Sequence, residues 1–201
     1  MDIKKLYDIL LSEKPSEEIK NNEKKIFKLI PELEVCKGFN QNNPWHVYDV
    51  YDHTMHVVDN VDNNIIIRMA ALFHDIGKPN TYTEDENKIG HFYGHYIESV
   101  KIFDAFSKRN NLNEDIVSSV KKLIFYHDKN IGKCNDEELK ELSNIFTLDE
   151  IRMLFQLKKA DLLAQNKKYH YILENYEVEE KELLKKKEHF TRWYSFIRWY
   201  F

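Results

Sequence analysis

The chain of 201 residues is poor in the residues that make tight turns, since it contains only five Gly and four Pro. These two types make up roughly 12% of average proteins, so their share here is less than half of the usual one. An all-β protein needs many tight turns, and the shortage therefore argues against that class. Cysteine is also scarce, because two Cys residues are too few for a disulfide framework. We therefore expect a protein of the reducing cytoplasm.

Long apolar runs are missing as well. No run approaches the roughly 18 residues that cross a bilayer, and residues 1–5 lack the apolar core of a signal peptide. We therefore expect no membrane partner. Acidic and basic residues nearly balance, with a formal net charge of −4. Because this charge gives no global attraction to nucleic acid, binding of that kind would need a local basic patch.

What the chain has in quantity is apolar residues, since Leu, Ile, Val and Phe make up 59 of its positions. They recur at helical spacing, which predicts an all-α protein. Residues 36–45 and 76–92 contain Gly and Pro and are expected to be loops, and a loop as long as the second is often functional. Pro31 is expected to end the second helix. The predicted helices lie near residues 3–11, 16–30, 46–60, 64–75, 93–109, 113–127, 136–146, 148–165 and 167–190.

We expect one domain over residues 1–165 and a C-terminal helical extension over residues 166–201 that packs on it. Residues 192–201 are strongly aromatic. Packing against the bundle is the simplest role for them, because an aromatic patch left bare at a terminus would be unusual. A homodimer through the aromatic C-terminus and a position at a membrane surface are the alternatives.

Nine His residues stand out in this helical chain. The most informative segment, residues 69–79, begins as an apolar helix that ends in adjacent His74 and Asp75. Adjacent residues of a helix diverge by about 100°, so both reach one ion only where the helix end points them inward. Alternatively, Asp75 can bridge two ions with its two oxygens. Mixed imidazole and carboxylate ligation suits one or two divalent ions of Mn, Fe, Ni, Co, Zn or Mg.

Other segments offer matching ligands. His53 lies within a predicted helix, His95 at a helix start and His127 at the end of an apolar run. Asp161 is a carboxylate among apolar helix positions, where a charge needs a partner. Each of these residues alone is more often a satisfied structural group than a ligand. Their order along the chain is more specific.

The candidate ligands follow one another in an order that resembles the HD-domain metal-dependent phosphohydrolase superfamily. This order is His, His-Asp-Ile-Gly-Lys, Gly-His, His-Asp and Lys-x-Ala-Asp. Residues 11–16, 31–33, 41–46 and 48–54 are also similar to the HD region of bacterial tRNA nucleotidyltransferases, the family of CCA-adding enzymes and poly(A) polymerases. The resemblance covers about residues 7–165 and implies an all-α HD-domain helical bundle. Because the sequence shows no nucleotidyltransferase module upstream of this region, we expect a standalone HD region that adds no nucleotides.

The resemblance also implies roles for individual residues. Four residues match the primary metal ligands of the superfamily: His53, His74, Asp75 and Asp161. Two residues match the ligands of a second metal, with Asp75 as the bridge: His95 and His127. Lys78 matches a lysine that faces the substrate phosphate.

The implied activity is that of a phosphodiesterase or phosphatase acting on a nucleotide, a 2′,3′-cyclic phosphate or an RNA 3′ end. A divalent ion would activate the attacking water. Asp75 would orient that water or accept its proton, and Lys78 would neutralise charge on the phosphoryl group. Lys158 or Lys159 could do likewise, although a solvated lysine is equally expected at either position.

Aromatic residues near the 76–92 loop could recognise a base. Tyr82 and Tyr93 border this loop and could stack on a nucleobase, or they could belong to the core. His91 and His95 have the spacing of a metal pair, but Gly94 between them indicates a helix start, so we assign only His95.

Two further function classes remain open. A non-catalytic HD fold could serve as an RNA- or protein-binding module, although every expected ligand is present in this chain. Six ligands would also permit a di-iron oxygenase.

Two other His residues receive weaker assignments, His46 as a residue near a helix start and His56 as a surface or packed residue.

Overall fold

The computed structural model describes the backbone of residues 1–200 and the side chains of residues 1–189. Helices form most of it, and the only strands in this described part make one short antiparallel hairpin, β1 (Thr83–Glu84) with β2 (Gly90–His91). The all-α prediction is thereby confirmed. The helices are α1 (Ile3–Leu10), α2 (Pro15–Asn21), α3 (Glu23–Leu29), α4 (Pro31–Cys36), α5 (Val50–Asp59), α6 (Ile65–Phe73), α7 (Lys78–Thr81), α8 (His95–Arg109), α9 (Glu114–Tyr126), α10 (Asp136–Ile145), α11 (Leu148–Leu163) and α12 (Leu173–Tyr200), with 3-10 turns η1 (Ile131–Lys133) and η2 (Lys167–Ile172).

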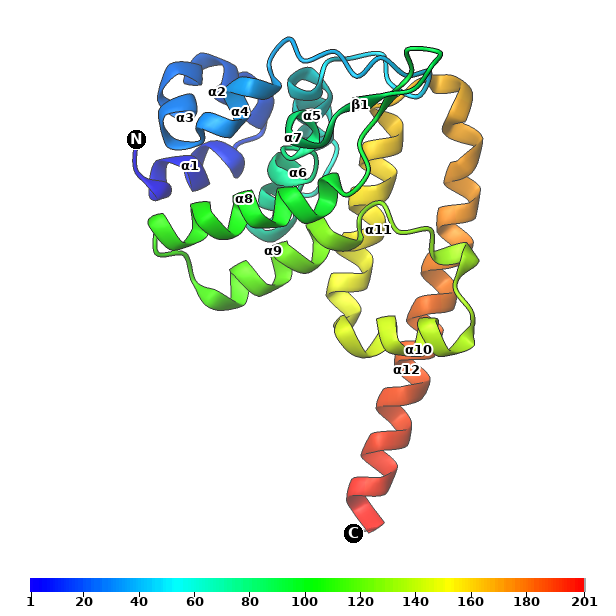
Figure 1. The fold of residues 1–201 in the computed structure, drawn as a ribbon. Helices are drawn as coiled ribbons and strands as arrows, with labels where there is room; N and C mark the ends of the chain where they lie inside the picture. The colour runs from blue at the N-terminus through cyan, green and yellow to red at the C-terminus, as the bar shows by residue number, and fades with distance from the viewer. Residues whose placement is uncertain (201) are drawn as a thin grey trace.

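The central helix of the bundle is α6 (Figure 1). Every residue from Ile67 to Phe73 is buried, and a helix that is apolar on all sides has to be surrounded by other elements. It packs against α5, α9, α11, α1 and α8. The C-terminal end of α6 therefore lies inside the bundle, where side chains from several helices can meet.

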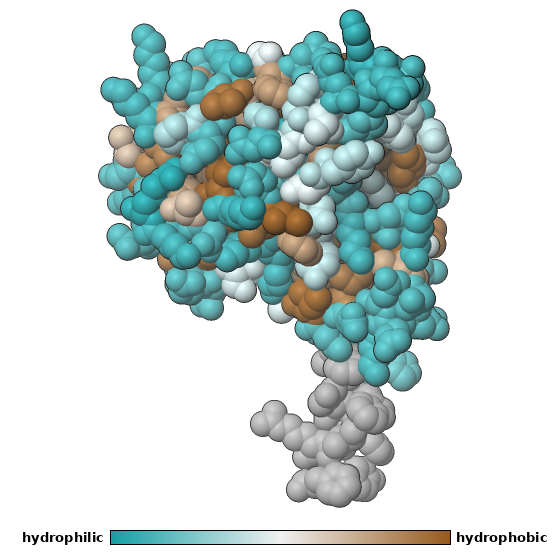
Figure 2. All heavy atoms as spheres, in the orientation of Figure 1, coloured by the Kyte–Doolittle hydropathy of each residue, from teal (hydrophilic) through white to brown (hydrophobic). Residues whose placement is uncertain are grey.

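The remaining helices form groups on either side of this centre. α1 to α4 lie together at one end, and α11 and α12 run antiparallel to each other at the opposite end, with α10 crossing below them (Figure 1). α8 and α9 form a helical hairpin that packs on α6. Apolar side chains occur as separate patches on the largely hydrophilic face that Figure 2 shows, because most large apolar residues are in the core.

Polar caps fix the starts of three helices that border the centre. The carboxylate of Asp49 accepts from Asp52 N at the start of α5, and Asn113 caps α9 in the same way. Thr147 and Glu150 form a capping box at the start of α11. Removing such a cap costs about 1 kcal/mol of stability, so each helix has a defined starting residue.

Several boundaries differ from the sequence prediction. The helix expected over residues 16–30 is divided at Asn22 into α2 and α3. Pro31 follows α3 as expected, but it also begins α4, because the missing N–H of a proline costs no hydrogen bond at the first helical position. Residues 46–49 are not helical, because α5 begins only after its cap, Asp49. The expected 76–92 loop contains α7 and the hairpin, and residues 167–172 form η2 before α12 begins.

No described helix is both long and apolar enough to cross a membrane. The side chains of residues 192–201 lie outside the described residues, so their packing and the homodimer through them stay predictions. The division of the chain at residue 165 stays a prediction as well. Beyond that point, α12 packs along α11, where Lys159 Nζ lies 2.7 Å from Glu180 Oε2.

Candidate metal centre

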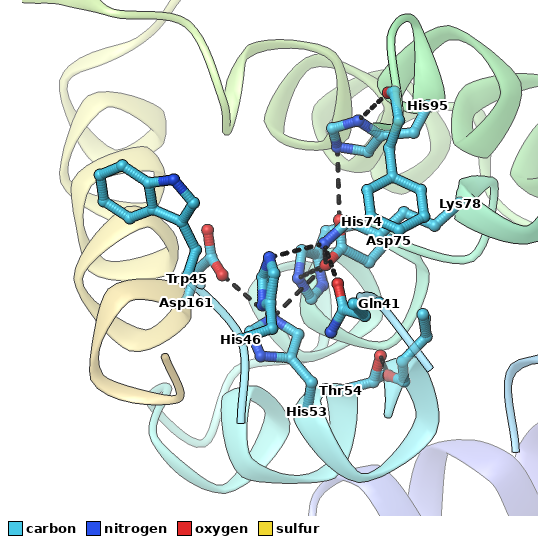
Figure 3. A network of polar contacts seen from close by, with 12 residues as sticks. Gln41, Trp45, His46, His53, Thr54, His74, Asp75, Lys78, His95 and Asp161 are labelled. Atoms are coloured by element: carbon cyan, nitrogen blue, oxygen red, sulfur yellow. Dashed lines mark hydrogen bonds and ion pairs between the residues drawn. The ribbon is translucent and has the colours of Figure 1, made fainter. Parts of the chain in front are cut away.

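One group of candidate ligands gathers His53 from α5, His74 and Asp75 from the end of α6, and Asp161 from α11 (Figure 3). His53 Nε2 lies 3.0 Å from Asp161 Oδ1 and 3.4 Å from Asp75 Oδ2. His74 Nε2 lies 3.2 Å from the same Asp75 oxygen. The four ligand atoms are all within 4.8 Å of one another. We call this group the first half of the centre.

A second group shares Asp75 and adds His95 and His127, and we call it the second half. The other oxygen of Asp75, Oδ1, lies 3.3 Å from His95 Nε2 and 3.7 Å from His127 Nε2. The two ring nitrogens lie 3.3 Å from each other. Each oxygen of Asp75 therefore faces a different pair of histidines, as a bridging carboxylate would.

Backbone carbonyls orient three of the four imidazole rings. The Nδ1 atoms of His74, His95 and His127 lie 2.8, 2.9 and 2.7 Å from the carbonyl oxygens three residues before them. A carbonyl only accepts, so Nδ1 must carry the proton. His74 and His127 find these carbonyls because each follows an apolar helix whose last C=O groups lack intrahelical partners. With Nδ1 bonded to a carbonyl, Nε2 is the ring nitrogen that faces the centre, the usual arrangement of a metal-binding histidine.

Unpaired buried atoms indicate that a cation fits here. His53 Nε2, His74 Nε2 and Asp75 Oδ2 are buried and have no hydrogen-bond partner of normal geometry among the described residues. An unsatisfied buried polar atom costs about 1–3 kcal/mol, and of these three only Asp75 Oδ2 has a cation beside it, the Lys78 ammonium at 2.6 Å. A divalent ion is the group that imidazole and carboxylate donors in this combination bind.

The protonation states suit such an ion. Burial opposes ionisation of Asp75, yet the charges of His74 and Lys78 hold its pKa well below the usual range. Burial acts in the same way on Asp161, and the adjacent His53 ring lowers the pKa of that carboxyl below its ordinary value. Burial lowers the pKa of His95 to about 4. At neutral pH, the carboxylates are ionised and the His95 ring is neutral, which are the forms that bind metals.

Lys78 begins α7 and lies directly against the centre. Its Nζ is 2.6 Å from Asp75 Oδ2, donates to Gln41 Oε1 at 2.8 Å and lies 5.3 Å from the ring centroid of Phe92. Gln41 is held in turn by donating from Nε2 to the Tyr48 carbonyl. Only 5% of Lys78 is exposed, so its charge acts in a largely dehydrated environment.

Sequence reasoning missed two residues of this network, Gln41 and His46. It placed Gln41 in a polar loop and His46 near a helix start, whereas the structure buries Gln41 and half-buries His46 beside Lys78. The His46 ring packs edge-on against His53 with 5.1 Å between centroids, and burial lowers the pKa of His46 to about 2. Local pattern does not reveal such burial, and the only signal was that residues 41–46 belong to the segments that carry the resemblance.

A cleft of about 1040 Å³ opens over the centre. Asp75, Lys78, His95, His127 and Asp161 are among the residues that line it. Aromatic residues line it as well, and they include Trp45, Tyr93, Tyr171 and Tyr176.

Two of these aromatic side chains are supported by stacking. Trp45 stacks on Tyr169 with 3.6 Å between ring centroids, and Tyr93 lies parallel to His91 at 5.4 Å. Tyr93 is 80% exposed, so it presents a large aromatic surface at the mouth of the cleft.

Two other residues predicted to bind substrate, Lys158 and Tyr82, do not point a free polar group into the cleft. Lys158 lines the cleft but is buried, and both of its hydrogen bonds go to main-chain carbonyls. Tyr82 is not among the lining residues; its hydroxyl bonds to Glu84 and accepts from Asn42 Nδ2 at 2.8 Å. Substrate contacts by Lys158 and Tyr82 stay predictions.

Gly77 joins the two halves of the centre. A Cβ atom at this position would lie 2.6 Å from both His95 O and Ser99 N, distances that real Cβ atoms do not adopt. The Gly77 N–H donates to Ser99 Oγ at 2.9 Å. Main chain from the His74–Asp75 turn thus packs directly on the first turn of α8, which carries His95.

Comparison with known proteins places the chain in a family. The model of the HD domain matches residues 45–182, and the chain belongs to the HD domain family. The membership of the HD-domain superfamily that the sequence predicted is thereby confirmed.

Individual relatives match a smaller part of the chain. It is 34% identical over 92 residues to a multifunctional CCA protein of Janthinobacterium sp. (strain Marseille), which is 44% of this chain and 21% of that protein. It is 32% identical over 72 residues to an A-adding tRNA nucleotidyltransferase of Deinococcus radiodurans, 33% of this chain and 16% of that protein. The matched part spans about a fifth of the length of these relatives.

Proposed function

We propose that the chain is a metal-dependent phosphohydrolase, a phosphodiesterase or phosphatase acting on a nucleotide, a 2′,3′-cyclic phosphate or an RNA 3′ end. The observation that carries the proposal is the position of Asp75. Its two oxygens face two sets of histidines, and Lys78 lies beside it in a cleft large enough for a nucleotide. Membership of the HD domain family supports the same class.

The chain's own residues define two binding positions for divalent ions. His53, His74, Asp75 and Asp161 would hold one ion, and Asp75 with His95 and His127 would hold another. Manganese, iron, nickel, cobalt, zinc and magnesium all fit the proposal. A bound divalent ion supplies Lewis acidity and makes hydroxide available from water near neutral pH.

Lys78 and Asp75 have further roles in this proposal. The buried Lys78 ammonium balances negative charge that builds on the phosphoryl group, and such a charge is worth more in a dehydrated site than in water. The ionised Asp75 orients the attacking water or accepts its proton. Because Gln41 holds the Lys78 ammonium at 2.8 Å, the charge is in place before substrate arrives.

Aromatic residues at the cleft mouth support a substrate with a nucleobase. Tyr93 is exposed and Trp45 is held by Tyr169, so each offers a ring that is already oriented. Stacking of this kind is worth about 1–3 kcal/mol per base. The relative named as an A-adding tRNA nucleotidyltransferase supports a nucleotide or an RNA end as the substrate class.

The test follows the products from a panel that includes 2′,3′-cyclic nucleotides, nucleoside monophosphates and short RNAs: the ring-opened nucleoside 2′- or 3′-monophosphate from the cyclic substrates, and phosphate, nucleoside or nucleotide from the others. Purified protein is assayed with Mn²⁺, Co²⁺ or Ni²⁺ beside the variant Asp75→Ala. We expect turnover that needs metal and is lost in the variant. Equal behaviour of both proteins with every metal would reject the phosphohydrolase and favour a binding module. Turnover that depends on O₂ would identify an oxygenase instead.

A further inference from the structure

Lys158 is a buried cation that the proposed reaction does not use. It lies on α11 three residues before Asp161, so it is one helical turn from a ligand of the first half. Its Nζ donates to His127 O at 2.8 Å and to Lys129 O at 2.9 Å. Only 3% of the residue is exposed. A lysine so deeply buried requires partners that offset its dehydration.

One of the two carbonyls that bind Lys158, that of His127, lies at the end of α9, and the other, that of Lys129, lies in the segment just after it. This helix ends at Tyr126, and His127 is its C-terminal cap. Carbonyls at a helix end lack intrahelical donors and carry partial negative charge, which an ammonium group satisfies. One ammonium bound to both oxygens fixes the path of the main chain as it leaves the helix, and the ligand His127 is part of that path.

α12 completes the surroundings of this ammonium. The ring of Tyr176 lies 4.9 Å from Lys158 Nζ, within the range of a cation–π contact. The same lysine therefore contacts the end of α9, belongs to α11 and packs under α12. No other ammonium in the described residues is shown bound to the backbone of a candidate ligand.

We propose that Lys158 is a positioning residue for the second half of the centre. It sets the backbone of His127, so that the ring can meet His95 and Asp75, and it does so from the helix that supplies Asp161 to the first half. The inference rests on the proposed function only in requiring that the centre binds two divalent ions.

Equilibrium dialysis of the full chain with Co²⁺ tests the proposal, with visible spectra recorded at each step. The wild type is expected to bind two equivalents. Lys158→Met keeps the length of the side chain but has no donor. It is expected to bind the first equivalent as the wild type does and the second about 10–100-fold more weakly, the usual cost of losing a support behind a ligand.

Lys159→Met is the matched control. Lys159 is the next residue of α11, and it pairs with Glu180 of α12 at 2.7 Å. The control therefore also removes a lysine charge and an α11–α12 contact, but nothing bonded to His127. We expect it to bind both equivalents with wild-type affinity.

Several outcomes would overturn the inference. These are two equivalents bound by Lys158→Met within twofold of the wild type, a second equivalent bound more tightly, equal weakening of both equivalents, or a single equivalent in the wild type. If Lys158→Met does not fold, Lys158→Gln replaces it, because its amide is polar but one bond shorter and is not expected to reach both carbonyls. A weaker second equivalent is expected there too, and unchanged binding would reject the role. A wild type that binds two ions but hydrolyses no phosphoester would refute the proposed function and leave this inference standing.

Discussion

The Nε2 atoms of His95 and His127 face each other at 3.3 Å. Each ring donates from Nδ1 to a carbonyl, at 2.9 Å and 2.7 Å, so the two Nε2 atoms are left to face each other. Such a contact is favourable only when a cation shares the space. Burial lowers the pKa of His95 to about 4, so a proton on this ring is not that cation at neutral pH. A metal ion bound by both nitrogens would supply that cation.

Asp161→Asn should lower bound metal and activity together. The amide keeps the size of the side chain but removes the charge that lies 3.0 Å from His53 Nε2. Metal analysis after dialysis gives the content, and we expect the loss of about one equivalent. Asp149→Asn is the control, since Asp149 also lies on α11 but its side chain is 86% exposed. Full metal content in Asp161→Asn would remove Asp161 from the ligand set.

Lys78→Met should reduce kcat by about 100-fold or more, the usual effect of losing one charge-stabilising donor. Its metal content should not fall, because Lys78 contributes no ligand and its charge repels cations near Asp75. Steady-state kinetics and metal analysis measure the two quantities. Lys101→Met is the control, with a side chain 68% exposed on α8. Metal loss that parallels the activity loss would contradict a role on the phosphoryl group.

Tyr93→Ala should lower kcat/KM for nucleotide substrates by about 5- to 150-fold, which corresponds to the stacking of one base. We expect the change mainly in KM, since Tyr93 is not among the candidate ligands. Tyr48→Ala removes another exposed tyrosine, one that packs on His56 and does not line the cleft. If both variants behave as the wild type, stacking on Tyr93 is excluded.

The metal-free protein should lose stability as the pH falls from about 6.5. Burial lowers the pKa of His95 to about 4 and that of His46 to about 2, whereas both titrate near 6.5 in the unfolded chain. The unfolded state therefore binds more protons below pH 6.5. Each histidine contributes stability that is complete above pH 6.5 and decreases by up to about 1.4 kcal/mol per pH unit below it.

Urea unfolding in the presence of a chelator, at pH 7, 6 and 5, measures this slope. The variants His46→Gln and His95→Gln should each have a smaller slope than the wild type. His56→Gln is the control, because His56 is exposed on α5. A free energy of unfolding that does not change between pH 7 and 5 would contradict the prediction.

The sequence predicted the helices well where apolar residues recur over several turns. α6 and α9 are of this kind, and each ends at a histidine whose chemistry is visible in the sequence. The break at Asn22 and the start of α4 at Pro31 were not predicted, because short helices depend on packing more than on pattern.

The candidate ligands could be named from the sequence because their order along the chain resembles that of the HD-domain superfamily. Their meeting point was not derivable from spacing, since Asp161 joins His53 across more than a hundred residues. Gln41 and His46 escaped prediction for a related reason. Polar residues in a loop are expected at the surface, and it is the contacts with Lys78, far along the chain, that bring these two into the site.

The contact of Gly77 with α8 has a consequence for every variant described above. Because Gly77 packs main chain against main chain, with its N–H bonded to Ser99, the separation between Asp75 and His95 does not depend on any ligand side chain. Replacing one ligand should then leave the other ligands in their positions. A centre that binds a single ion could then be studied by spectroscopy. Gly77→Ala should do the reverse, keeping every donor while changing the distance between the two ions.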